Sequence, residues 1–78
     1  MTPGSADDLL GAVHRRIGGG IDIQTFSEGG IEVRWRRSYG EELSDERFAS
    51  ARSLLGALRA VLRHEDEADA ADALEAAP

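Results

Sequence analysis

Histidine is the side chain best suited to exchange a proton near neutral pH, and His14 and His64 are the only two in this chain. The sequence predicts them on separate helices, and nothing in it brings them together. The stretch at residues 63–67, RHEDE, places carboxylates beside an imidazole. It lacks the ligand spacing of a zinc site or a calcium loop. We therefore expect no metal site and no cofactor.

The glycines at residues 18–20 do not form a nucleotide-binding loop. A Walker A motif needs a lysine after its glycines, and the chain contains no lysine. The triplet follows a predicted helix and precedes a predicted strand, which is the reverse of the dinucleotide-binding order. No nucleophile elbow is present either. The sequence therefore predicts that the protein is not an enzyme.

Residues 34–40, RWRRSYG, combine arginines with aromatic side chains. Arg34, Arg36 and Arg37 could contact phosphates while an aromatic ring stacks on a base. Against this, the formal net charge of the chain is −6, whereas domains that bind nucleic acid usually present a basic surface. A small dimeric nucleic-acid-binding regulator that uses these arginines is the alternative function.

The whole net charge comes from the C-terminal segment. Residues 1–63 contain nine arginines and nine acids, and residues 64–78 contain no base. The acids of this segment are Glu65, Asp66, Glu67, Asp69, Asp72 and Glu75. The sequence thus predicts a single domain over 1–63 and an acidic extension over 64–78, which either continues the last helix or frays. An ordered array of acids would be drawn to surfaces rich in Arg and Lys, a frayed segment would only keep the protein soluble, and a third alternative is that the segment folds back on the chain's own arginines.

Residues 5–37 predict a helix followed by a β-hairpin. Ser5 caps a helix over residues 6–17, and one of the following glycines can end it in the left-handed conformation. Residues 21–37 then alternate between apolar and polar side chains around a glycine-containing turn, as a hairpin does. Cross-strand partners share a face of the sheet. This predicts that Ile21 lies opposite Trp35, Ile23 opposite Val33 and Asp22 opposite Arg34, with Phe26 pointing outward.

A second helix is predicted over residues 45–64, with Ser44 as its cap. Its apolar stripe contains Phe48, Ala51, Leu55, Leu58 and Leu62. The element order α-β-β-α predicts an α+β class, a two-layer fold in which a β-hairpin packs on two helices and an acidic C-terminal extension follows. A lone hairpin leaves two open edges, so we expect a homodimer that forms through sheet edges or helix faces. A compact monomer is the alternative.

No stretch is long and apolar enough to cross a membrane, and the N-terminus lacks the features of a signal peptide. The chain also contains no cysteine, which excludes disulfides and thiolate metal sites. These features predict a cytoplasmic protein that does not bind membranes.

A very short, cysteine-free, acidic α+β chain without an active-site motif resembles the small inhibitors of phages and other mobile elements, in particular the anti-CRISPR proteins. The resemblance implies a non-catalytic inhibitor that binds a guide-RNA surveillance complex and blocks target DNA binding by covering a basic surface. The expected partner is thus a basic protein or ribonucleoprotein complex. On this interpretation, the contact residues are Glu65, Asp66, Glu67, Asp69 and Asp72, with Phe26 as an exposed apolar anchor.

Overall fold

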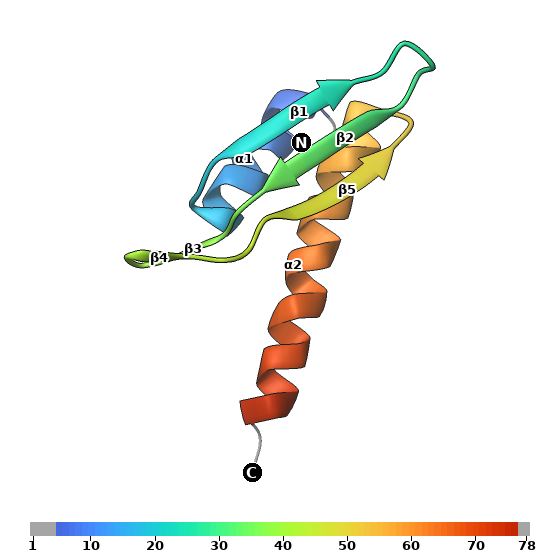
Figure 1. Ribbon diagram of the computed structural model, residues 1–78. Coiled ribbons are helices and arrows are strands. Elements are labelled where there is room, and N and C mark those ends of the chain that lie inside the picture. The colour runs from blue at the N-terminus through green and yellow to red at the C-terminus, as the bar shows by residue number, and fades with distance from the viewer. Residues whose placement is uncertain (1–4, 77–78) are drawn as a thin grey trace.

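The computed structural model of the protein describes residues 5–76. Helix α1 (Ala6–Ile17) leads into the antiparallel strands β1 (Ile21–Thr25) and β2 (Ile31–Trp35). A small hairpin of β3 (Ser38–Tyr39) and β4 (Glu42–Leu43) follows, then strand β5 (Arg47–Ala51) and the long helix α2 (Leu54–Ala76). Both helices lie on the same face of a three-stranded sheet in the order β1-β2-β5 (Figure 1). The α+β class, the hairpin and the C-terminal helix are confirmed.

Helix α1 begins and ends where the sequence predicts. Ser5 accepts a hydrogen bond from the backbone N–H of Asp8 at 3.1 Å, and Gly18 ends the helix with a φ of 66°. Glycine is required at position 19 for a different reason. A Cβ on Gly19 would lie 2.3 Å from the carbonyl oxygen of Arg36, so only glycine lets the two backbones approach this closely.

The hairpin has the predicted register. Ile21 pairs with Trp35, Asp22 with Arg34, and Ile23 with Val33. The inner side of the sheet packs against α1 and α2 in a core that contains Val13, Ile17, Val33, Trp35, Ala49, Ala57, Leu58, Ala60 and Val61. Ile23 shares the inner face but is 42% exposed, because β1 is one of the two edge strands of the sheet.

The prediction of a helix from residue 45 is wrong. Residues 47–51 form β5, which pairs with the free side of β2, and α2 begins only at Leu54. Ser53 rather than Ser44 caps this helix, since its Oγ accepts the N–H of Gly56 at 3.0 Å. Ser44 instead closes the base of the β3–β4 hairpin, where its N–H donates to the carbonyl oxygen of Arg37 at 2.8 Å.

Strand β5 forms here because β2 would otherwise leave one row of backbone donors and acceptors unpaired. As a strand, the segment buries Ala49 against the helices and turns Phe48 outward, where that ring is 66% exposed. The predicted helical stripe therefore assigned Phe48 to the wrong side of the molecule.

Candidate partner-binding surface

One carboxylate of the acidic segment lies inside the protein. Glu65 is 0% exposed, because α2 passes under the end of β2 and aligns it with the apolar side of the helix that carries Leu58 and Val61. The indole N–H of Trp35 donates to Glu65 Oε2 at 3.1 Å, and Arg47 donates to the same oxygen. The other oxygen, Oε1, lies 3.5 Å from Arg37 Nη1 and accepts no hydrogen bond.

Two further acids of α2 are paired at the surface of the body. Arg16, at the end of α1, lies 2.8 Å from Asp66 Oδ1 and 2.6 Å from Asp69 Oδ2. Arg37 donates to Asp69 Oδ1 at 2.5 Å. Hydrogen bonds from Arg16 and then from Arg37 hold the pKa of Asp69 below its ordinary value of 3.8. Together with Glu65 and Arg47, these residues form a charged joint that fixes α2 to α1 and to the sheet.

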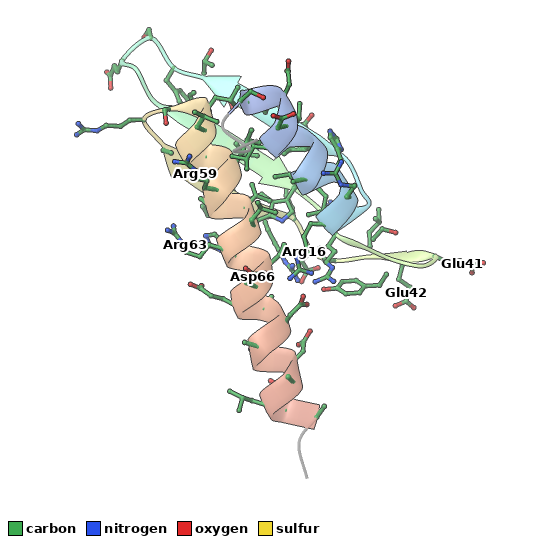
Figure 2. The ribbon with its side chains drawn as sticks, turned by 180° about the vertical axis from the view of Figure 1, so that it is seen from behind. Arg16, Glu41, Glu42, Arg59, Arg63 and Asp66 are labelled. Atoms are coloured by element: carbon green, nitrogen blue, oxygen red, sulfur yellow. The ribbon has the colours of Figure 1, made fainter. Side chains whose placement is uncertain are left out.

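The charged joint also holds the β3–β4 hairpin. The guanidinium of Arg37 lies 5.1 Å from the ring centroid of Tyr39 in a cation–π contact. Arg47 donates to the hydroxyl of Tyr39 at 3.4 Å and to Glu65, and these two bonds raise the pKa of the guanidinium, Glu65 having the larger effect. The hairpin and α2 therefore leave the body in different directions from one rigid base, as Figure 2 shows with Glu41, Glu42 and Asp66.

Beyond the charged joint, α2 continues as a helix past the sheet (Figure 1). Residues 70–76, the distal end of α2, are all exposed. Within the described residues, Asp72 and Glu75 form no ion pair, and Leu74 is 78% exposed. Helical spacing groups Ala70, Ala71 and Leu74 on one side, and it places Asp72 and Glu75 on the adjoining side, where Glu75 follows Ala71 by one turn. The distal end is thus a small amphipathic helix that packs against nothing else in the described chain.

The acids proposed from the sequence fall into two groups. Glu65, Asp66 and Asp69 belong to the charged joint, and Glu65 is inaccessible to a partner. Glu67 and Asp72 are exposed and lie outside the joint. Phe26 is 46% exposed in the β1–β2 turn, which lies at the opposite end of the molecule from the distal end of α2 (Figure 1). The structure therefore does not bring Phe26 and the acids together on one surface.

The arginines of the alternative proposal do not form one basic patch. Arg34 lies 2.5 Å from Glu32 and opposite Asp22 in the register, while Arg37 belongs to the charged joint. Arg36 is exposed and has no ion-pair partner within residues 5–76. Two of the three positive charges are thus balanced by the chain's own acids.

Two candidate features were missed at the sequence level. Leu74 was not proposed as a contact residue from the sequence, although its spacing from Ala70 and Ala71 already indicated an apolar side. The inward position of Glu65 also had a local signal, because Glu65 follows Leu58 and Val61 by seven and four residues and so continues the apolar stripe of α2.

Comparisons with protein-family models, with curated proteins and with solved structures identified no match for this chain. Across residues 5–76, no helix is both long and apolar enough to cross a membrane.

Proposed function

We propose that the protein is a non-catalytic inhibitor that binds a basic protein or ribonucleoprotein complex through the distal end of α2. The observation that supports this proposal is the projection of an ordered helix with an exposed leucine and two unpaired acids beyond the body of the protein. The charged joint holds the base of this helix, so that binding would not have to order a flexible segment.

The shape of the distal end suits insertion into a groove. An amphipathic helix binds by burying its apolar side in the groove while its polar side chains contact residues at the rim of the groove. Leu74 would occupy the apolar floor, and Asp72 and Glu75 would face arginines or lysines that otherwise contact nucleic acid. Such binding would block the nucleic acid and would weaken as salt screens the charges.

A guide-RNA surveillance complex, the partner that the anti-CRISPR resemblance implies, is the first to test. On this proposal the inhibitor acts in the cytoplasm of a cell that carries a phage or another mobile element. Binding of labelled target DNA to the purified complex is measured by fluorescence anisotropy, with and without the protein and at increasing salt.

We expect inhibition by the natural chain and a loss of about tenfold or more in potency for Leu74→Ser, and likewise for the pair Asp72→Asn and Glu75→Gln. The matched control removes two exposed acids elsewhere, with Glu41→Gln and Glu42→Gln in the β3–β4 hairpin. An equal loss in the control would show that only net charge matters. Unchanged DNA binding with the natural chain present would reject this complex as the partner.

We also infer that the chain forms a homodimer, because β1 and β5 leave both edges of the three-stranded sheet unpaired in the described structure. Light scattering over a range of concentrations tests this inference independently of the inhibitor proposal.

A further inference from the structure

Strand β5 presents an open edge beside a groove. The groove is lined by residues 46–50 and by His64 of α2. Phe48, whose ring is 66% exposed, lies in the middle of this strand on the outer face of the sheet. An exposed edge with a central aromatic ring is a site where another strand can add to the sheet.

The hydrogen bonds of the neighbouring strands show which backbone groups of β5 are free. At the two ends of the β1–β2 ladder, Arg36 donates its N–H to Gly20 and Phe26 donates to Gly30. Bonding alternates along an antiparallel strand, so the even-numbered residues of β2 bond to β1 and the odd-numbered ones to β5. By the register of β2 with β5, Phe48 and Ser50 therefore direct their N–H and C=O groups toward the open edge.

We propose that a second copy of this chain adds to this edge, with β5 antiparallel to β5 about a twofold axis at Ala49. In this register Ala49 faces its own copy and Phe48 faces Ser50. Both Phe48 and Ser50 exchange hydrogen bonds with the partner strand, as their free backbone groups require. The result is a continuous six-stranded sheet in which the two Phe48 rings lie diagonally beside each other.

Charge supports a second copy as the occupant. The same register places Glu46 opposite Arg52 at one end of the paired strands and, by symmetry, Arg52 opposite Glu46 at the other. Within the described residues, neither side chain has an ion-pair partner. The strand is therefore complementary to itself in both charge and hydrogen bonding.

The helix side of the β5 edge carries several small side chains. The inner face of β5 carries the small residues Ala49 and Ala51, and the Arg47 side chain is held in the charged joint by Glu65. On α2, the neighbours of His64 one turn away in each direction are Ala60 and Ala68. In this arrangement the two α2 helices would meet beneath the joined sheets near these small side chains, with the exposed Arg63 and Glu67 beside them.

The other edge is less suited to self-pairing. In β1 the same alternation directs the backbone N–H and C=O groups of the odd-numbered residues toward the open edge of that strand. Pairing about Ile23 would then bring Asp22 opposite Gln24, with no opposite charges facing each other, and a shift of register by two residues in the partner strand would bring Asp22 opposite Asp22. The repulsion of like charges directly opposite each other destabilises such a pair.

This inference rests on the self-association proposed above and adds its surface and register. The test measures the dimer dissociation constant by sedimentation. Glu46→Arg alone and Arg52→Glu alone place like charges opposite each other, and each is expected to weaken dimerisation about tenfold or more. The two changes together exchange the charges and are expected to restore the natural constant within about threefold. Phe48→Ser is expected to weaken the dimer as well, and Gln24→Arg on β1 is the matched control with no effect.

Cysteine cross-linking tests the register. The natural chain has no cysteine, so Ala49→Cys is expected to form a disulfide with its own copy on oxidation, because facing residues in a pair without direct hydrogen bonds lie about 4.5 Å apart between Cα atoms. Cross-linking of Phe48→Cys in place of Ala49→Cys would overturn this register.

The possible failures are distinguishable. A monomer at every concentration would overturn both the self-association and its β5 surface. A dimer whose dissociation constant is unaffected by the changes at positions 46, 48 and 52 would overturn the β5 surface alone. Neither result bears on the inhibitor proposal, whose test depends on the distal end of α2.

Discussion

The proximal and distal acids of α2 have the same chemistry but opposite surroundings. Glu65 and Asp69 contact arginines of three other elements, α1, the loop after β2, and β5. Asp72 and Glu75, one to three turns further along, contact none in the described structure. The difference arises because the body of the protein ends between the two groups. Within one run of acids, some can therefore stabilise the fold through ion pairs while others stay unpaired, depending on where the arginines lie.

This division also changes how the charge is distributed. Three of the nine arginines, Arg16, Arg37 and Arg47, neutralise acids of α2. The charges of residues 1–63 sum to zero only when these three arginines are counted there and not with the acids that they neutralise. Within the folded protein the body thus retains acids in excess, and the negative field is not confined to the C-terminal segment.

The largest expected effect comes from comparing a chain cut before the proximal acids with a chain cut between the proximal and distal acids. A chain that ends at residue 64 loses Glu65 and with it the partner of Trp35, Arg37 and Arg47, and we expect no cooperative unfolding. A chain that ends at residue 70 keeps the charged joint and is expected to fold. Urea denaturation followed by circular dichroism measures both, and folding of the shorter chain would refute the structural role of the proximal acids.

Removal of the buried carboxylate alone should have the next largest effect. Glu65→Ala leaves Trp35 Nε1 and Arg47 without their acceptor and removes the carboxylate beside Arg37, and breaking a buried pair in this way costs about 3 kcal/mol of unfolding free energy. Glu67→Ala, an exposed acid on the same helix, is the control and is expected to leave the urea midpoint unchanged. Similar midpoints for the two variants would contradict the comparison.

Asp69→Asn should destabilise the protein less, because Asp69 lies at the surface of the joint. Its pKa is lower in the folded than in the unfolded chain, so its contribution is present above pH 3.8 and is lost as the pH falls through the folded value. We expect the natural chain to be more stable than the variant at pH 7, and we expect the gap to close only as the pH falls below 3.8 and through the folded pKa. A gap that is independent of pH would show that this carboxyl does not contribute as an ion.

The smallest effect on stability is expected for the distal acids. Asp72→Asn with Glu75→Gln should leave the urea midpoint of the protein unchanged, because neither side chain contacts another described residue. The same variant should nevertheless lose binding to the partner, as described above. A marked fall in stability would place these acids with the proximal group.

Local patterns predicted α1 and the β1–β2 register, because caps and alternation act between residues that are close in sequence. They did not predict β5. Phe48, Ala51, Leu55 and Leu58 have helical spacing, and only the need of β2 for a second partner makes residues 47–51 a strand.

The charged joint was beyond local patterns for the same reason. Arg16 and Asp66 are 50 residues apart, and Arg37 and Asp69 are 32 apart. The sequence raised the alternative that the acidic segment folds back on the chain's own arginines. Helical spacing indicates that Glu65 faces inward, but only the path of α2 under the sheet decides which arginines the acids meet.

The single tryptophan of the chain gives this joint an optical signal. Trp35 is 2% exposed, bonds to Glu65, and packs edge to face against His64 with 5.7 Å between ring centroids. Its fluorescence therefore arises at the one place where the sheet meets α2. Release of the helix would expose the indole to water and move the emission to longer wavelength, so docking of α2 can be followed in real time without an added label.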